Sequence, residues 1–437
     1  MLKNLVKTKK LNRLLAIALV IFGLGCLYPH YHNRYQQKQD LKLEETQLGA
    51  LKANLDKSFR EKTNWPEAIK LNDKELKVEY TFNLQLSNYI KKLLSQYHSD
   101  YSTVIVIDNN TGEILSAIGH QRDGNQFSCA LPFSSTHPSA SLIKIVTAAE
   151  LLQHSTVDAQ TVFSFNGRST TLFRYQLRDN WTRWSRHQSL KDAFAKSNNV
   201  IFAKAAINFL KGDSIYQMAN DFGFNQELMR EVTLSRSTFP MPIDQFHLAE
   251  LASGYNDQTL ISPVHAALLA SIVANDGVLV YPSMVSRLLD SHTMRECWQN
   301  KTRNKRVLDG HTSAAMREMM ENTIVSGTAR GSFRRMAFSI KKELRIGGKT
   351  GSITGGIPFG KRDWFTVYAV PKDPGMGKGI SISVMNVNVN KWFVRSTYLA
   401  KSIIEYYYQD IFLLNRSLGQ SKKREISSPV VKNKIDV

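Results

Sequence analysis

The chain has 437 residues and a strongly basic composition. Its 57 Lys and Arg residues outnumber 37 Asp and Glu residues, which gives a formal net charge of +20 at pH 7. Hydrophobic residues make up 42% and charged residues 22%, the proportions of a folded globular protein rather than of a disordered or membrane-embedded one. The basic residues are spread along the chain without a nucleic-acid-binding motif, so we expect no nucleic-acid partner.

An apolar run near the N terminus predicts export and membrane anchoring. Residues 14–28 read LLAIALVIFGLGCLY; five basic residues precede this run, and the first acidic residue is Asp40. The run is shorter than the about 20 residues of a typical span, so a cleaved signal peptide and lipidation at Cys26 are alternatives. Because no clean small-residue cleavage site follows, we expect a cytoplasmic stub and single-pass anchor over residues 1–30, with the remainder outside the cytoplasm.

The polar residues after the anchor favour helix. Leu41, Leu48 and Leu55 recur seven residues apart, which is the spacing of an amphipathic helix. A coiled-coil seam needs more heptads than this. We therefore expect a helical stalk or linker over residues 31–78, with a solvated spacer as the alternative.

From about residue 80 the pattern becomes that of a folded domain. Residues 84–97 have helical spacing, and residues 103–118 read as strand, Asn-Asn-Thr-Gly turn and strand, which predicts a hairpin. Helical stretches dominate residues 141–275, and strand patterns return at 364–370 and 380–386. Strands on both sides of a helical middle predict an α+β fold whose antiparallel sheet joins early and late strands.

The end of the chain and the cysteines add little to this picture. Residues 416–437 are polar and basic, which predicts a disordered tail, so the ordered domain is expected over residues 79–415.

Cys129 and Cys297 could pair in an oxidising compartment or stay reduced, and their spacing does not decide between the two. The eleven histidines show no metal-ligand spacing, so we expect neither a metal site nor a cofactor.

The first motif with chemical meaning is Pro138-Ser-Ala-Ser141-Leu-Ile-Lys144, which leads into a mostly apolar stretch. This pattern places Ser141 at the start of a buried helix with Lys144 three residues on, on the same face. A serine needs a base to become a good nucleophile, and a lysine serves as that base only when burial or a nearby cation lowers its pKa. The S-x-x-K pattern alone is weak evidence, since Ser339-Ile-Lys-Lys342 also matches and is expected to be a basic surface segment.

Two further motifs follow in order. Ser197-Asn198-Asn199 lies between two helical segments, and residues 347–352 read GGKTGS ahead of a strand that starts near Asp363. The small residues of the second motif would let a substrate backbone approach the edge of a strand. The order S-x-x-K, S-x-N and K-T-G is a known signature of serine acyl-transfer enzymes.

These motifs resemble those of the transpeptidase domain of penicillin-binding proteins, over about residues 80–408. Further stretches similar to the family are the hairpin IDNNTGEIL, the segment SGTARG, and ISPVHA followed by ANDG. The resemblance implies the fold shared by penicillin-binding transpeptidases and serine β-lactamases, in which helices flank an antiparallel sheet beside an all-helical subdomain. Two departures are S-N-N as the second motif and Ser352 where many members have threonine.

The resemblance also implies roles for residues of the first and third motifs. Ser141 would attack the carbonyl between two terminal D-alanines of a peptidoglycan stem peptide, and an amine or water would resolve the acyl-enzyme. Lys144 would be the base. Lys349 would disfavour protonation of Lys144 and attract the terminal carboxylate of the substrate, with the Thr350 hydroxyl as a second contact.

The remaining implied roles concern the leaving group and the oxyanion. Ser197 would pass a proton to the departing amine, and the Asn199 amide would hold the lysine base and the substrate amide in register. Backbone N–H groups of Ser141 and Ser352 are candidates for stabilising the oxyanion. Gly351 would leave room for the substrate, although an ordinary strand glycine is the alternative reading.

The resemblance leads us to expect a D,D-transpeptidase in the inner membrane of a bacterium, with its catalytic domain in the periplasm. Its partners would be peptidoglycan stem peptides and, as covalent inhibitors, β-lactam antibiotics. About 70 residues separate the anchor from the hairpin, too few for a polymerising domain, so a separate glycan polymerase is an expected partner.

Three alternatives remain at this point. A D,D-carboxypeptidase shares the fold and the motifs. A class A or class D-like β-lactamase would need a water-activating base, for which Glu231-Val-Thr-Leu-Ser235 comes near the required pattern. A non-catalytic scaffold for cell-wall assembly is the alternative from another class, although a scaffold has no need for all three motifs.

Overall fold

The computed structural model describes residues 43–61, 65–71, 73–178 and 181–409. The predicted anchor over residues 1–30 and the predicted tail lie outside these ranges. Within them, no helix is both long enough and apolar enough to cross a membrane.

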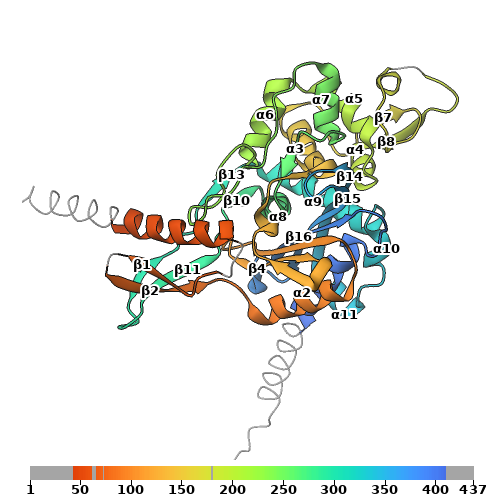
Figure 1. Ribbon diagram of the computed structural model, residues 1–437. Coiled ribbons are helices and arrows are strands. Elements are labelled where there is room, and N and C mark those ends of the chain that lie inside the picture. The colour runs from red at the N-terminus through yellow and green to blue at the C-terminus, as the bar shows by residue number, and fades with distance from the viewer. Residues whose placement is uncertain (1–42, 62–64, 72, 179–180, 410–437) are drawn as a thin grey trace, which may run out of the picture.

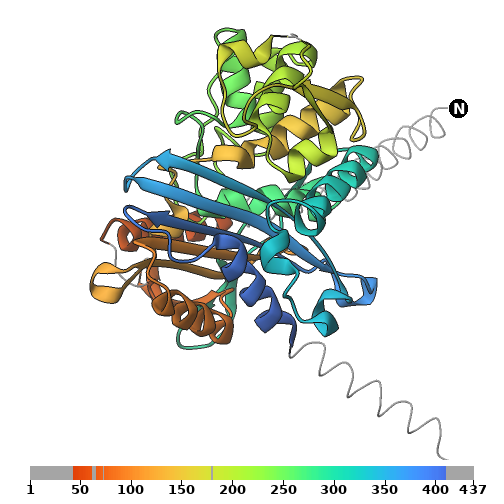
Figure 2. The ribbon, with the colours of Figure 1, turned by 90° about the vertical axis from the view of Figure 1, so that its right-hand side faces the viewer.

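A six-stranded antiparallel sheet forms the centre of the domain (Figures 1 and 2). Its strands, in spatial order, are β14 (Leu344–Gly355), β15 (Gly360–Pro371), β16 (Ile380–Asn388), β3 (Tyr101–Asp108), β4 (Ile114–Gln121) and β5 (Gln126–Ser128). The pairing of β3 with β16 joins the early hairpin to the late strands, which confirms the α+β prediction. Strand β14, which carries the K-T-G motif, forms one edge of the sheet.

The central strands β15, β16 and β3 are buried at nearly every position because both faces of the sheet are covered. Val104 and Val106 pack toward one face, and Ile105 and Ile107 pack toward the other; all four are fully buried. Helix α2 (Leu84–Gln96) and a helix over residues 396–409 cover the first face, as Figure 2 shows. Helix α8 (Pro263–Ala274) covers the second. Alternation of side chains along a strand produces this division.

The helical subdomain lies on the α8 side of the sheet (Figure 2). Its main helices are α3 (Lys144–His154), α4 (Leu190–Ala195), α5 (Asn199–Phe209), α6 (Gly212–Asp221) and α7 (Gln245–Ser253), and α9 (Gly310–Val325) connects it to the sheet. Shorter elements are α10 (Arg330–Phe333), α11 (Phe338–Lys341), and the paired strands β6 (His137–Pro138) with β9 (Leu260–Ile261), β7 (Val162–Phe165) with β8 (Arg186–Ser189), and β10 (Val278–Val280) with β13 (Asn304–Arg306).

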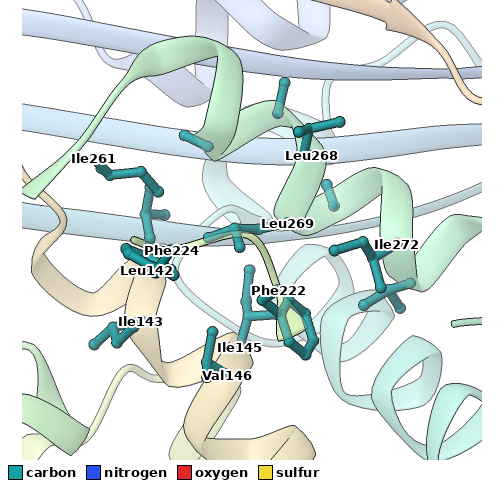
Figure 3. Close-up of a cluster of buried hydrophobic side chains, with 14 of the residues drawn as sticks. Leu142, Ile143, Ile145, Val146, Phe222, Phe224, Ile261, Leu268, Leu269 and Ile272 are labelled. Atoms are coloured by element: carbon teal, nitrogen blue, oxygen red, sulfur yellow. The ribbon is translucent and has the colours of Figure 1, made fainter. Parts of the chain in front are cut away.

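A buried cluster of side chains that includes residues of α3 and α8 anchors the first motif in the core. Figure 3 shows Ile145 and Val146 of α3 in one buried cluster with Leu269 and Ile272 of α8 and with Phe222. Helix α8 in turn packs on β15, β16 and β3. The start of α3 therefore has a fixed position relative to the sheet, which matters for the site below.

The segment before the hairpin is not the helical stalk that the sequence predicted through residue 78. Residues 43–61 are helical, but residues 68–80 contain β1 (Ala68–Leu71) and β2 (Lys74–Tyr80). These strands join a second sheet, in the order β1-β2-β11-β12, with β11 (Val285–Asp290) and β12 (Glu296–Gln299). The partner strand β11 lies about 200 residues away in sequence, so local helical spacing did not predict this pairing.

The heptad leucines of the helix over residues 43–61 pack onto the same chain. Leu55 is fully buried in the main core cluster, and Leu48 is partly buried against it. Leu51, between the two, is also fully buried, and Phe59 packs with Trp65 and Phe133. The seven-residue spacing therefore reports an intramolecular contact. Cys129 follows β5 of the central sheet, Cys297 lies on β12 of the second sheet, and the two are not joined by a disulfide.

We predict that Leu55→Ala lowers the free energy of unfolding by about 2–5 kcal/mol, because it leaves a cavity in a filled core. Leu43→Ala, in the same helix but 56% exposed, is the control and should change stability little. Thermal or denaturant unfolding of the two variants measures the difference. Equal stability of the two variants would mean that this helix is not docked in solution.

Candidate active site

A cleft of about 760 Å³ lies between the edge strand β14 and the helical subdomain. Six of the predicted site residues line it, namely Ser141, Ser197, Asn199, Thr350, Gly351 and Ser352. The two remaining ones, Lys144 and Lys349, are fully buried and reach lining serines through hydrogen bonds. The tertiary structure thus brings together all eight residues from motifs that are up to two hundred residues apart.

The nucleophile candidate Ser141 lies in a 3-10 turn (Ala140–Ile143) that leads directly into α3. Ala140 has φ of 48°, in the left-handed region that non-glycine residues seldom adopt. Such strained backbone is concentrated at functional sites because surrounding structure must hold it in place. The turn also puts Ser141 near the N-terminal end of α3, where the helix dipole favours developing negative charge.

The amine of Lys144 has three polar neighbours. Its Nζ lies 2.7 Å from Ser141 Oγ, 2.7 Å from Asn199 Oδ1 and 2.5 Å from the carbonyl oxygen of Ser253. The amide and carbonyl oxygens can only accept, so two N–H groups of the amine point at them. A neutral amine has two N–H groups and one lone pair, so its lone pair is left for the hydroxyl proton of Ser141.

The electrostatic surroundings favour this neutral form of Lys144. Complete burial lowers its pKa well below the usual range for lysine, and the neighbouring cation Lys349 lowers it further. Both effects have the same sign because each disfavours the protonated form. The position of Lys144 therefore suits a general base.

Lys349 lies on β14 and is also completely buried. Its Nζ lies 2.8 Å from Ser197 Oγ and donates to the carbonyl oxygen of Thr350 at 2.8 Å. Burial lowers its pKa to about 7. At neutral pH, Lys349 therefore exists as a mixture of the charged and neutral forms, and an anionic ligand in the cleft would favour the charged one.

The second motif is held in a strained turn between α4 and α5. Ser197 has φ of 57° and points its hydroxyl at Lys349. The Asn199 Nδ2 group donates to the carbonyl of Thr170 at 3.0 Å, which turns its oxygen toward Lys144. Asn198 faces elsewhere: its side chain caps α5 by accepting from the Ile201 N–H.

Strand β14 passes very close to the turn that carries the nucleophile. A Cβ atom added to Gly351 would lie 3.2 Å from Ala140 Cβ and 3.4 Å from Ser141 N. The turn itself therefore restricts the size of the residue at position 351. That Gly351 leaves room for the substrate stays a prediction. The Thr350 hydroxyl lies 2.6 Å from the Thr328 hydroxyl, so its orientation is fixed as well.

Sequence reasoning missed three contributors to this site. Two are the backbone carbonyls of Ser253 and Thr170, which orient Lys144 and Asn199 and have no residue-type signal. The third is Thr328, which lies within the SGTARG segment that resembles the family but had no assigned role. Its place in a family-like segment ahead of the K-T-G strand was the available signal.

Two other residues considered in the sequence lie away from the cleft. Glu231, the candidate base of a β-lactamase, is buried, and its carboxylate accepts from the Met284 N–H at 2.8 Å. It is not among the described residues that line the cleft. Ser339 of the second S-x-x-K pattern lies exposed on α11. Within the described ranges, no group of three His, Cys, Asp or Glu side chains is placed to hold a metal ion.

An antiparallel sheet with a K-T-G edge strand, and a buried lysine beside a serine at a helix start, define the class of penicillin-binding and serine β-lactamase-like folds. A family model described as the penicillin binding protein transpeptidase domain matches residues 102–386, more than half of the chain. The chain belongs to this family.

Three known proteins illustrate the similarity. Stage V sporulation protein D of Bacillus subtilis (strain 168) is 22% identical over 292 residues, which is 64% of this chain but only 44% of that protein. Penicillin-binding protein A of Mycobacterium tuberculosis, solved as a ceftriaxone acyl-enzyme complex, is 18% identical with a TM-score of 0.57, covering 75% of this chain and 79% of that one. The D,D-transpeptidase domain of a peptidoglycan glycosyltransferase from Eggerthella lenta is 18% identical with a TM-score of 0.60, covering 77% and 84%.

We predict a bell-shaped pH dependence for the second-order rate constant of acylation by a penicillin. The rate constant rises with pH through the lowered pKa of Lys144, because only the neutral amine accepts a proton. It falls above about pH 7, where Lys349 loses the charge that attracts the penicillin carboxylate. In Lys349→Gln the alkaline limb should disappear, and the acidic limb should move to higher pH because a cation near Lys144 is gone. A wild-type plateau through about pH 9 would contradict these assignments.

We also predict that Gly254→Ala impairs acylation. Gly254 ends α7 with φ of 70°, and an added Cβ would collide with the carbonyl oxygen of Ala140, next to the nucleophile. Relieving the collision must shift the turn that carries Ser141. Gly331→Ala is the matched control, since a Cβ at that position meets nothing within 4 Å. Acylation rates and unfolding midpoints of both variants test this, and a normal rate in Gly254→Ala would contradict it.

Proposed function

We propose that this protein is a D,D-transpeptidase that cross-links peptidoglycan stem peptides through a serine acyl-enzyme. The observation that carries the proposal is the placement of the Lys144 amine 2.7 Å from Ser141 Oγ, with the Asn199 and Ser253 oxygens as acceptors for two N–H groups. In the neutral amine, this arrangement leaves the lone pair for the Ser141 hydroxyl. Family membership and the acyl-enzyme complex of a structural relative support the same reaction class.

In the acylation step, Lys144 takes the hydroxyl proton as Ser141 Oγ attacks the carbonyl of the penultimate D-alanine. The N–H groups of Ser141 and Ser352 stabilise the oxyanion, and losing one such donor costs about 3 kcal/mol in known hydrolases. Ser197 gives its proton to the departing D-alanine amine and regains one from Lys349, which lies 2.8 Å away. The carboxylate of the donor peptide binds near Lys349 and the Thr350 hydroxyl.

In the second step, the amine of a neighbouring stem peptide attacks the acyl-enzyme. Its surplus proton passes back through Ser197 to Lys349, and Lys144 returns its proton to Ser141 Oγ. Each residue thus recovers its starting protonation state. Asn199 keeps Lys144 in register throughout, since its own orientation is set by Thr170.

We propose a cellular location on the basis of the sequence. An anchor over residues 1–30 holds the chain in the inner membrane of a bacterium, and the domain over about residues 79–415 works in the periplasm. A separate glycan polymerase supplies the strands. Polymerisation of lipid-linked precursor by the isolated protein would contradict that last point.

We predict that a fluorescent penicillin labels the protein covalently and that Ser141→Ala abolishes the label. Ser339→Ala, at the serine of the second S-x-x-K pattern, is the control and should label like the wild type. Lys144→Ala should slow acylation by about 10²–10⁴-fold, the range for losing a general base. Labelling that survives Ser141→Ala would rule out the proposed nucleophile.

The fate of the acyl-enzyme separates the alternatives. With a stem pentapeptide and an acceptor amine, a transpeptidase forms the cross-linked product, whereas a carboxypeptidase releases D-alanine and a tetrapeptide only. Rapid loss of the penicillin label would indicate a β-lactamase, which the location of Glu231 away from the cleft disfavours. No label at all would indicate a scaffold.

A further inference from the structure

A projection on the helical subdomain exposes aromatic and cationic side chains. It consists of the hairpin β7–β8 and the loop between its strands, at the upper right of Figure 1. We call residues 162–178 and 181–189 the arginine-aromatic lobe. Its four most exposed aromatic residues are Phe173 (50%), Tyr175 (60%), Trp181 (75%) and Trp184 (73%). Its five arginines are all exposed: Arg168, Arg174, Arg178, Arg183 and Arg186.

The composition of the lobe is unusual for a solvated loop. Two of the six tryptophans of the chain lie here, and both are about three-quarters exposed. Single apolar residues scattered over a surface are ordinary, but a cluster of exposed aromatic rings among several arginines is not. Clusters of exposed aromatic rings are typical of surfaces that bind a ligand or a partner.

The lobe is preorganised by internal contacts. Gln176, 1% exposed, accepts from the Phe173 N–H at 3.0 Å and donates to the carbonyl of Asn166 at 3.0 Å, which ties the loop to the end of β7. The rings of Phe173 and Tyr175 are stacked with centroids 5.7 Å apart. The lobe therefore presents its side chains without a large ordering cost on binding.

The two tryptophans are positioned by their neighbours as well. The Trp181 ring packs against His187 at 4.9 Å, and the Arg183 guanidinium lies 4.8 Å from the centroid of the Trp184 ring. The chain between the two tryptophans forms a turn, in which the Ser185 N–H donates to the Thr182 carbonyl. The outer surface of the lobe thus combines aromatic faces with cations.

The lobe is continuous with the catalytic cleft. The Asn199 N–H donates to the carbonyl of Ser169 at 2.7 Å, and its side chain donates to the carbonyl of Thr170. Thr170 itself lines the cleft, and Asn198 bonds the side chain of Gln188 at 3.0 Å. A ligand that occupies the cleft and extends toward the lobe would contact one rigid piece of the protein.

The chemistry of the lobe suits an anionic carbohydrate. The C–H faces of sugar rings pack on aromatic rings, and arginine pairs well with carboxylates through its planar guanidinium. The stem peptides of the proposed reaction carry carboxylates and hang from a sugar polymer, so that polymer must pass near the cleft. The lobe has five arginines and, within residues 162–189 of the sequence, a single acidic residue.

We propose that the arginine-aromatic lobe binds the glycan strand that carries the stem peptide. The inference rests on the proposed function, because it identifies the polymeric part of the same substrate. An anionic membrane surface would also attract arginine and tryptophan. The lobe lies at the far end of the molecule from the helix over residues 43–61, as Figure 1 shows, and the predicted anchor precedes that helix. A strand of the cell wall therefore fits the location better than a lipid surface does.

The test compares binding to two probes with detergent-solubilised full-length protein. One probe is uncross-linked glycan strands that bear pentapeptides, and the other is the free pentapeptide. Trp181→Ala/Trp184→Ala and, separately, Arg178→Gln/Arg183→Gln should each weaken strand binding by about tenfold or more, the effect of losing about 1.4 kcal/mol. Binding of the free pentapeptide should change far less.

Phe338→Ala and Lys341→Gln/Lys342→Gln are matched controls. Phe338 is 78% exposed on α11, a basic segment away from the cleft, so these variants remove an exposed aromatic ring or two cations elsewhere and should bind strands like the wild type. Equal losses in lobe and control variants would overturn the proposal, as would strand binding unchanged by the lobe variants.

Two further readouts distinguish the sources of failure. Vesicles of phosphatidylglycerol that bind through the lobe, with no binding of strands, would overturn the glycan assignment in favour of a membrane surface. Acylation of each variant by penicillin, a ligand without a glycan, reports on the cleft; acylation lost in step with strand binding would show that the lobe merely supports the second motif. If the wild type is not acylated at Ser141 at all, the proposed function itself fails.

Discussion

The site depends on holding one lysine amine in a place that water does not reach. Lys144 has two acceptors for its N–H groups and a serine hydroxyl for its lone pair, and no room for solvation of an ammonium ion. Desolvation is the larger reason that its pKa is low, with the neighbouring Lys349 second. Burying a lysine costs free energy that the rest of the core must offset. The arrangement therefore needs a large folded body around a few reacting atoms.

The core supplies this support through a short chain of contacts. Helix α8 packs on three strands of the central sheet, and the turn Ala140–Ile143 before α3 packs directly on β14 and β15, so the first turn of α3 is located relative to β14. Strained backbone at Ala140 and Ser197 and the close approach of Gly254 and Gly351 then aim the side chains. Strained backbone and very close packing each cost free energy of folding, and together they specify one geometry of the cleft.

The same geometry links the reacting groups to the surface on which a polymer substrate would lie. Asn199 bonds Lys144 on one side and Thr170 on the other, so one side chain connects the proposed base to the arginine-aromatic lobe. The roles that we propose for Lys144 and Lys349 differ because the two side chains differ in position, not in residue type. Burial lowers the pKa of Lys349 to about 7, and its amine faces Ser197, where it can attract an anion. The pKa of Lys144 is lowered by its own burial and also by the neighbouring Lys349.

The sequence by itself determined the motifs, the early hairpin, the late strands and the buried start of α3, because these follow from local periodicity and from residue type. Family resemblance added the grouping of Ser141, Ser197 and Lys349. Only the tertiary structure decided that residues 68–80 join a second sheet, that Glu231 lies off the cleft, and that the carbonyls of Ser253 and Thr170 orient the site. Strand partners distant in sequence and backbone carbonyls have no residue-specific pattern, so their contributions exist only once the chain is folded.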